Sequence, residues 1–222
     1  MEDENRDARR RMIEVAERLV AEEGLGSVSL RRVGQEAGQR NNSAAQYHFG
    51  SRQGLVDAIV QLRSAQIDAR RAELLTALEK ELDGRPADVR SLVRLLVHPL
   101  VESAAGEPRR THYLRFLANA TDHYSLRGSW QVGEFHPPTY QLVVQRLRAT
   151  LPGVSQATFD RRMRWVSRVS LRLLADHELT LVQDDGGLVA GTTAQVLADV
   201  VDMLVALVAA PDDHGDEAGD QD

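Results

Sequence analysis

The segment from Ser27 to Leu55 constrains the fold more than any other, because it predicts two short helices joined by a glycine corner. Ser29 stands at the N-cap of the first helix, where its hydroxyl can accept a backbone N–H of the first turn. Gly38 stands just past the end of that helix, where a left-handed backbone is unstrained for glycine. We expect the second helix from about Asn42 to Phe49. The first helix buries one stripe of apolar residues spaced at i, i+3 and i+7, namely Leu30, Val33 and Ala37.

The expected second helix has an unusually polar face. Asparagine and glutamine can form paired hydrogen bonds with adenine, arginine can bind guanine or phosphate, and alanine can touch a thymine methyl group. The alternative interpretation is a polar surface helix in an ordinary helical domain. The residues that offer this chemistry are Arg40, Asn41, Asn42, Ser43, Gln46 and Arg52.

The run from Glu36 to Leu55 resembles the DNA-binding end of the TetR family of bacterial repressors. That family has an alanine–glycine corner, a recognition helix that ends in an aromatic–His–Phe step, and a Ser–Lys–x–x–Leu helix start. The stretch from the corner to the phenylalanine is one residue longer here than the commonest family spacing, so the turn or the first helical turn must be rearranged. Arg52 replaces the usual lysine, which keeps the charge but offers a fork of donors. The matching residues are Ala37, Gly38, Tyr47, His48, Phe49, Ser51, Arg52 and Leu55.

This resemblance implies an all-α protein with an N-terminal three-helix head, which contains a helix-turn-helix, and a larger C-terminal helical domain. We expect residues 1–50 to form the DNA-binding head and residues 51–210 to form the ligand-binding and dimerisation domain. Residues 211–222 are expected to form an acidic, disordered tail. The long helix that starts after Ser51 belongs to both parts, and is therefore a candidate lever between them.

The function that the resemblance implies is a ligand-responsive transcriptional regulator, most often a repressor. It would bind a pseudo-palindromic double-stranded DNA operator as a homodimer, and a small-molecule effector would release it by favouring a head separation that no longer fits the groove spacing. Arg52, Tyr47 and either Ser29 or Arg32 are expected to hold phosphates. The candidates for base edges are Arg40, Asn41, Asn42, Ser43 and Gln46. The candidate DNA-binding residues are Ser29, Arg32, Arg40, Asn41, Asn42, Ser43, Gln46, Tyr47, His48 and Arg52.

The composition excludes several classes of protein. There are no cysteines, so disulfides and thiolate metal sites are ruled out and a reducing compartment is expected. The N-terminus is charged, unlike a signal peptide, and the longest apolar run, Met203 to Ala210, is far shorter than the ~20 residues that cross a bilayer. We therefore expect a cytoplasmic protein with no membrane partner.

The net charge of −6 is unexpected for a protein that binds DNA, but it comes from one end of the chain. Residues 211–222 contain six acidic residues and no lysine or arginine, so residues 1–210 carry no net charge. Residues 5–55 contain nine arginines against six acidic residues. This modest local positive charge suits a small head that docks on phosphates.

Helical spacing continues along the rest of the chain, and no stretch reads clearly as a strand. Glycine, proline and N-cap residues mark the ends of the expected helices, and Thr192 and Gln195 have the spacing of a capping box. The stretch 123–136 has glycines and no helical period, so it is expected to be a loop. The expected helices are 5–24, 51–82, 87–102, 108–122, 137–151, 155–182 and 192–209.

The last expected helix is apolar nearly all round, which predicts burial on two sides. The family resemblance implies that it joins the preceding helix in a four-helix bundle with a second copy of the chain. A central helix within a single subunit is the alternative. The candidate dimer-interface residues are Phe159, Met163, Val166, Leu173, Val196, Val200, Met203 and Leu207.

No arrangement of residues points to an enzyme, a metal site or a cofactor. The chain has no Gly-x-Ser-x-Gly elbow, P-loop or dinucleotide fingerprint, and each histidine is better explained by packing or the surface than by metal binding. Aromatic residues gather in the central third, where they predict either an apolar ligand pocket or ordinary core packing. The candidate pocket residues are Gln66, Arg70, His112, Tyr113, Phe116, Trp130, Phe135 and Tyr140.

Two other functions fit the same residues. One is a helical small-molecule-binding or enzymatic protein that does not bind DNA. The other is a structural dimer that recruits a partner protein through the acidic tail.

Overall fold

The chain folds into helices only, within the residues that the computed structural model describes: 2–41, 43–105, 111–122, 137–182 and 191–212. The all-α prediction is therefore confirmed. None of these helices is long and apolar enough to cross a membrane. The elements in chain order are α1 (Glu2–Glu23), η1 (Leu25–Ser27), α2 (Leu30–Glu36), α3 (Ala44–Phe49), α4 (Arg52–Leu82), α5 (Val89–Ala105), α6 (Tyr113–Asp122), α7 (Pro138–Ala149), α8 (Gln156–Val182) and α9 (Thr193–Ala209).

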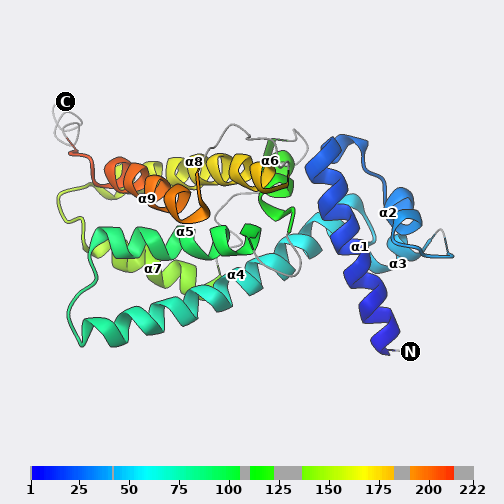
Figure 1. Ribbon diagram of the computed structural model, residues 1–222, viewed down its shortest axis with the longest axis horizontal. Helices are drawn as coiled ribbons and strands as arrows, with labels where there is room; N and C mark the ends of the chain where they lie inside the picture. Colours follow the sequence, from blue (N-terminus) through cyan, green and yellow to red (C-terminus); the bar gives the residue numbers. More distant parts are fainter. Residues whose placement is uncertain (1, 42, 106–110, 123–136, 183–190, 213–222) are drawn as a thin grey trace, which may run out of the picture.

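Helices α1 to α3 form one end of an elongated molecule, and α5 to α9 form the other (Figure 1). We call α1–α3 the head and α4–α9 the body. Helix α4 starts beside α3 and runs along the length of the body, so it connects the two parts. The buried residues of head and body form one continuous core, from Met12 of α1 to Val208 of α9. The head is therefore packed against the body through apolar contacts as well as through α4.

The expected helices agree with the observed ones, with shifts at their ends. Helix α3 starts at Ala44, not at about Asn42, and α6 is described from Tyr113 onward. The capping box at the start of α9 is present, because the Thr192 hydroxyl accepts the Gln195 N–H and the Gln195 side chain accepts the Thr192 N–H. The expected loop 123–136 and the tail after Asp212 lie outside the described residues.

Pro99 lies inside α5 and removes one hydrogen bond of that helix, which Arg71 of α4 replaces. Proline has no N–H, so the carbonyl of Leu95, four residues earlier, loses its usual helical donor. Arg71 is 3% exposed, and its Nε donates to that carbonyl at 3.1 Å. Burial lowers the pKa of Arg71, against the effect of its neighbour Asp68. A buried arginine therefore satisfies a carbonyl that the α5 sequence leaves without a partner.

Asp68 pairs with this arginine and also holds the start of α7. Its carboxylate accepts Arg71 Nη1 at 2.8 Å, and it accepts the backbone N–H groups of Thr139 and Tyr140 at 3.0 and 2.9 Å. The first N–H groups of a helix have no partner within the helix, so a carboxylate at that position is favourable. The Arg71–Asp68 pair thus joins α4, α5 and α7.

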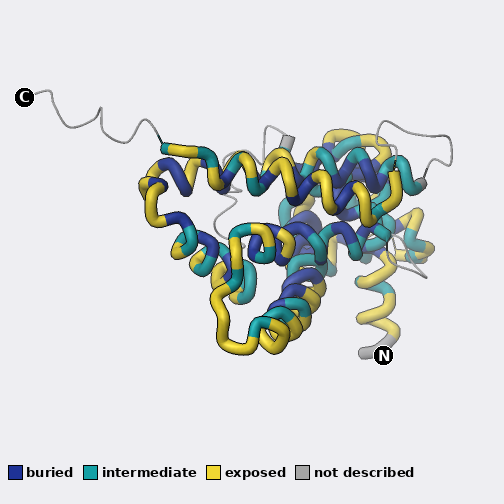
Figure 2. Tube along the Cα trace, turned by 60° about the vertical axis from the view of Figure 1, so that its left-hand side comes forward, coloured by how far each residue is buried: buried dark blue, intermediate teal, exposed yellow. Residues whose placement is uncertain are grey.

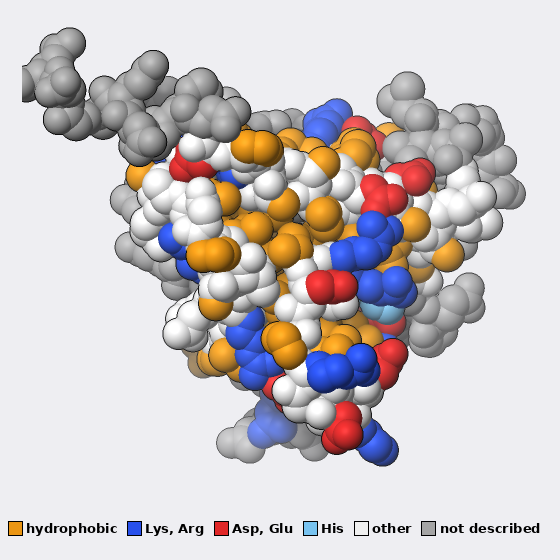
Figure 3. Space-filling model, turned by 90° about the vertical axis from the view of Figure 1, so that its left-hand side faces the viewer, with side chains coloured by type: hydrophobic (Ala, Val, Ile, Leu, Met, Phe, Trp, Pro, Cys, Tyr) orange, Lys and Arg blue, Asp and Glu red, His pale blue; other side chains and the backbone are white. Residues whose placement is uncertain are grey.

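Most of the body's buried residues lie where helices face one another, while the first turns of α1 stand out into solvent (Figure 2). At the end of the body away from the head, apolar side chains gather on the surface beside charged ones (Figure 3). The large apolar residues that remain exposed are Tyr47, Leu142, Trp165, Val169 and Met203.

We expect Asp68→Ala to lower the free energy of unfolding by about 3–5 kcal/mol, because it leaves Arg71 buried without a counter-charge. Urea denaturation at one fixed protein concentration measures this change. Glu73→Ala is the control, since Glu73 pairs with the exposed Arg70 on the same helix and its side chain is 65% exposed. The control should unfold like the wild type. Equal unfolding of both variants would show that the buried pair does not support the fold.

Candidate nucleic-acid interface

Helices α2 and α3 meet at a glycine corner, as the sequence predicts. The Ser29 hydroxyl accepts the Arg32 N–H at 3.2 Å and so caps α2. Gly38 has φ 71°, a left-handed conformation that favours glycine. Gly34 lies against α3, because a Cβ atom placed on it would lie 3.8 Å from the Cβ of Ala45. The two helices therefore pack closely through small residues.

The longer connection enlarges the turn and not the helix. Asn41 Oδ1 accepts the Ser43 N–H at 2.9 Å, and the Asn41 carbonyl accepts the Ala44 N–H at 3.0 Å. Arg40, Asn41 and Ser43 are exposed in this turn, before α3 begins. Asn42 lies outside the described residues. Part of the expected base-reading face is thus presented by a turn.

Helix α3 buries one side and exposes the other. Ala45 and Phe49 are in the core, whereas Gln46 and Tyr47 are exposed, and Tyr47 is 83% exposed. The Gln46 side chain donates to the carbonyl of Gly50, which turns it toward the end of its own helix. His48 is half-buried, and its ring lies 5.4 Å from that of Tyr47 with an angle of 79° between the two planes. Burial lowers the pKa of His48.

The step from α3 to α4 requires glycine at position 54. The Ser51 hydroxyl accepts the Gly54 N–H at 3.0 Å and caps α4. A Cβ atom on Gly54 would lie 2.1 Å from the carbonyl oxygen of Phe49, so no larger residue fits without a backbone shift. This tight junction places Arg52 on the surface in the first turn of α4, close in the chain to the exposed face of α3.

Arg32 is held by acidic residues of the head. It donates to both Glu23 carboxylate oxygens at 2.6 Å and to Glu36 at 2.9 Å, and Glu36 also accepts Arg18 at 2.8 Å. These contacts link α1 to α2. Two acidic neighbours thus already neutralise Arg32, and its phosphate contact stays a prediction.

Outside α1, three arginines of the head and of the first turn of α4 have no counter-charge among the described residues. Arg31, Arg40 and Arg52 are exposed, and none makes an ion pair with a residue that the structure describes. Arg31 was not among the expected DNA-binding residues, because the sequence does not show which arginines pair within the head. Uncompensated guanidinium groups on an exposed face are what phosphate binding requires.

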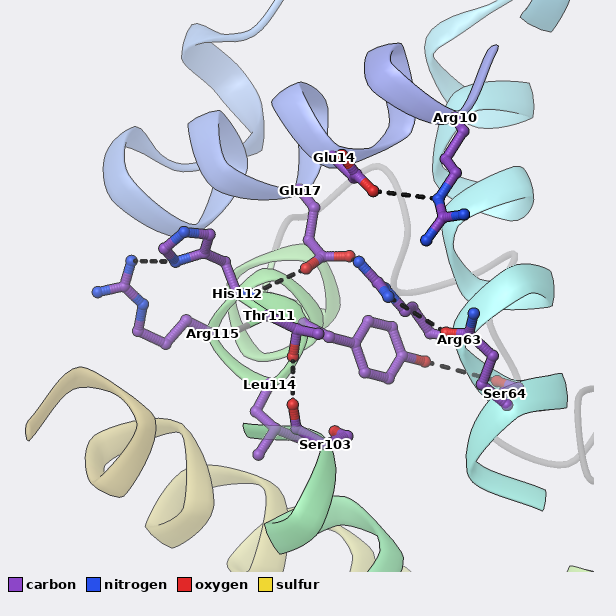
Figure 4. Close-up of polar contacts among 12 residues, drawn as sticks. Arg10, Glu14, Glu17, Arg63, Ser64, Ser103, Thr111, His112, Leu114 and Arg115 are labelled. Atoms are coloured by element: carbon purple, nitrogen blue, oxygen red, sulfur yellow. Dashed lines mark hydrogen bonds and ion pairs between the residues drawn. The ribbon is translucent and has the colours of Figure 1, made fainter. Parts of the chain in front are cut away.

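The head is joined to the body by a buried carboxylate (Figure 4). Glu17 of α1 is 1% exposed, and its Oε2 accepts Arg63 Nε of α4 at 2.7 Å. Its Oε1 accepts the backbone N–H of His112, just before α6, at 2.8 Å. Burial raises the pKa of Glu17, and Arg63 opposes that rise. No pattern in the sequence marks Glu17, which lies on the apolar side of an otherwise ordinary helix.

A second buried carboxylate binds the start of α6 from the other side. Glu178 of α8 accepts the backbone N–H groups of Leu114 and Arg115 at 3.2 and 3.0 Å. Burial raises the pKa of Glu178 to about 7. Farther along α6, the Asn119 amide donates to the carbonyl of Val20 at 2.9 Å, near the end of α1. Helix α6 is therefore fixed between the head and α8.

The expected pocket residues do not come together as one group. Tyr113 and Phe116 are buried in the core with their rings stacked 6.1 Å apart, and His112 is half-buried beside them. Gln66 and Arg70 are exposed on α4, and Arg70 is bound to Glu102 and Glu73. Tyr140 packs under Arg71, 5.4 Å from its guanidinium carbon. Trp130 and Phe135 lie outside the described residues.

Most of the expected dimer residues lie in the core of the chain itself, and their part in a dimer stays a prediction. Five of them are buried in the core of one subunit, because they face the other helices of the body: Phe159, Met163, Val166, Val196 and Val200. Leu173 and Leu207 are half-buried, and only Met203 is exposed, at 47%. Two exposed apolar residues of α8 outside that set are Trp165 and Val169, which are 49% and 38% exposed.

One comparison with known proteins identifies the body. The model of the tetracyclin repressor-like C-terminal domain matches residues 94–207, from α5 to α9. No curated protein matches this chain. Among the residues that the structure describes, no group of three or more histidine, aspartate or glutamate side chains could hold a metal ion.

We expect the stability of the protein to fall between about pH 4.5 and pH 7 through Glu178. A carboxyl group whose pKa is raised on folding binds its proton more tightly in the native state, so its contribution is complete below about 4.5 and is lost as the pH rises through about 7. Glu178→Gln should remove this dependence. Relative to the wild type, the variant should gain on the order of 1–3 kcal/mol between pH 5 and pH 8. Urea denaturation at four pH values measures the difference, and parallel curves would contradict it.

Proposed function

Because the chain belongs to the TetR family of regulators, we propose that it is a ligand-responsive transcriptional regulator that binds a pseudo-palindromic DNA operator as a homodimer. Repression is the usual mode of that family. The observation that carries the proposal is a set of exposed side chains around the α2–α3 turn. Tyr47 is 83% exposed, and Arg31, Arg40 and Arg52 are exposed without an ion pair to a described residue. The close packing at the glycine corner holds these polar side chains on the surface in a fixed arrangement, which supports recognition more than a plain surface helix.

On this proposal the head divides its contacts between phosphates and bases. Arg31, in α2 before the turn, and Arg52, in α4 after α3, are the candidates for phosphate contacts, together with the hydroxyl of Tyr47. Arg40 and Asn41 in the turn and Gln46 of α3 are the candidates for base edges. The side chains of Asn41 and Gln46 each already make one hydrogen bond within the head. Their remaining side-chain donors and acceptors are the ones available to DNA.

The seam between α8 and α9 is the proposed dimer surface. Val169 lies two helical turns after Arg162, on the side of α8 where Arg162 donates to the carbonyl of Val208 in α9. Trp165 is stacked by Arg161, 5.8 Å from its ring centre, and Met203 adds an exposed side chain from α9. These side chains give one subunit an exposed apolar strip that a second copy can bury.

Charge on the two helices also suits a two-fold arrangement. Asp199 of α9 is exposed and forms no ion pair with a residue that the structure describes, whereas Asp202 already pairs with Arg90 of α5. A two-fold axis that brings α8 of one subunit against α9 of the other would match opposite charges. The outer face of α8 carries a row of exposed arginines at helical spacing, namely Arg161, Arg164, Arg168 and Arg172.

Helix α6 is the proposed link between an effector and the head. Its first N–H groups are held by Glu178 of α8 and, just before it, by Glu17 of α1. A ligand that moves α6 must therefore move the head or break these buried contacts. It can do so only if it binds the two arrangements with different affinities.

Operator selection with the purified protein tests DNA binding directly, and an enriched palindrome is the expected result. Arg52→Ala should weaken binding to all duplexes alike and reduce the log–log salt slope by about 0.9. Arg40→Ala should instead relax base preference at one position per half-site, by roughly 1–3 kcal/mol. Lys80→Ala, at the far end of α4, is the control and should bind like the wild type. A selection that returns no enriched sequence would favour the non-DNA-binding alternative.

The dimer surface is tested by Trp165→Glu, which should give a monomer because it places a charge in the apolar strip. Sedimentation equilibrium measures the oligomeric state. Leu142→Glu is matched to it, since Leu142 is a 38% exposed apolar residue of α7, outside the seam, and this variant should remain a dimer. A dimeric Trp165→Glu protein would place the interface elsewhere.

A further inference from the structure

A groove lies between α5 and α9 on the surface of the body. Its volume is about 370 Å³, within the usual range of small-molecule sites. Its lining includes the buried apolar residues Val101, Leu197 and Val201. The groove stays open because α9 presents Ala194 and Ala198 here, whose side chains are too small to fill it.

One wall of the groove is charged. Four residues of α5 follow one another at four-residue intervals, so they share one face of the helix. Two of these side chains have counter-charges. Arg90 pairs with Asp202 of α9, and the Glu102 carboxylate accepts Arg70 Nε and Nη2 of α4 at 2.7 and 3.0 Å. The four residues are Arg90, Arg94, His98 and Glu102.

Arg94 is the uncompensated charge of this wall. It is exposed, and it forms no ion pair with the part of the chain that the structure describes. His98 lies one turn away, with its Nε2 3.4 Å from Glu102 Oε1. Burial lowers the pKa of His98, so the imidazole adds no second positive charge near neutral pH. The groove therefore combines one open guanidinium with an apolar lining.

We propose that this groove binds a small organic monocarboxylate with an aliphatic body. The guanidinium of Arg94 can donate two parallel hydrogen bonds to a carboxylate, and the aliphatic part can lie along Val101, Leu197 and Val201. Arg94 is the guanidinium of this wall that forms no ion pair with a described residue, since Arg90 is already paired with Asp202. A single carboxylate head is the charge that this wall accommodates.

The groove remains accessible in the proposed dimer. Residues two apart on a helix point away from one another, so Val201 in the groove and Met203 on the seam lie on opposite sides of α9. A second copy that covers Met203 and Trp165 therefore leaves the groove open. The site concerns binding alone, and it stands whether or not the head binds DNA.

Calorimetric titration of the full chain with sodium octanoate, without DNA, tests the proposal. One saturable site per chain is expected. Arg94→Gln should weaken binding about ten-fold or more, since it removes a charge-assisted pair, and Arg94→Lys should recover part of the affinity. Ala198→Phe should abolish binding by filling the groove. Arg85→Gln, at an exposed arginine after the end of α4 and outside the groove, should leave it unchanged.

Circular dichroism shows that each variant is folded, and octyltrimethylammonium is titrated as a cation of the same chain length. Failure of octanoate to bind would overturn the proposal. So would unchanged affinity in both Arg94→Gln and Ala198→Phe, which would locate the octanoate elsewhere. Equal affinity for the cationic analogue would overturn the role given to Arg94.

Discussion

The Glu17 carboxylate is the contact on which the relation of head and body depends. A carboxylate that is 1% exposed is costly unless charge and hydrogen bonds compensate for lost water. Arg63 of α4 and the backbone N–H of His112 supply that compensation. One partner is a side chain of α4 and the other is a backbone group just before α6. Helix α1 therefore cannot shift relative to α4 and α6 without leaving a charge or an N–H unpaired.

The body uses the same device twice more. Glu178 binds the first N–H groups of α6, and Asp68 binds those of α7 while it neutralises Arg71. In each case an acidic side chain from a long helix meets the start of a shorter one, where partial positive charge collects. The short helices are thereby fixed in direction as well as in position. Apolar packing alone would leave them freer to slide.

Charge that is not used inside the protein marks its surfaces. The arginines of the head divide into those that pair internally, such as Arg18 and Arg32, and those with open charges, such as Arg40 and Arg52. On α8, Arg164 and Arg168 are exposed without an ion pair to a described residue, whereas Arg172 pairs with Asp176. Arg94 lies in the groove beside α9. The surfaces proposed for DNA, for a second copy and for a carboxylate thus share one feature: each contains at least one arginine without an ion pair to a described residue.

The helices could be predicted from local sequence patterns, because apolar spacing, caps and glycine corners act within a few residues of the chain. It also placed Ser29, Gly38 and Ser51 correctly, since a cap depends only on its own helix. It did not show that α3 begins at Ala44, because the extra residue could enter either the turn or the helix.

Which residues face outward, and which charges are paired, depends on how the helices pack against one another. Phe159 and Val200 are as apolar as Trp165 and Met203, and the sequence does not separate the inner from the outer apolar face of a helix that packs on two sides. Arg32 and Arg40 look alike in the sequence, yet one is bound by Glu23 and the other is open. Ion pairs and buried carboxylates join residues far apart in the chain, so their partners exist only once the helices have packed.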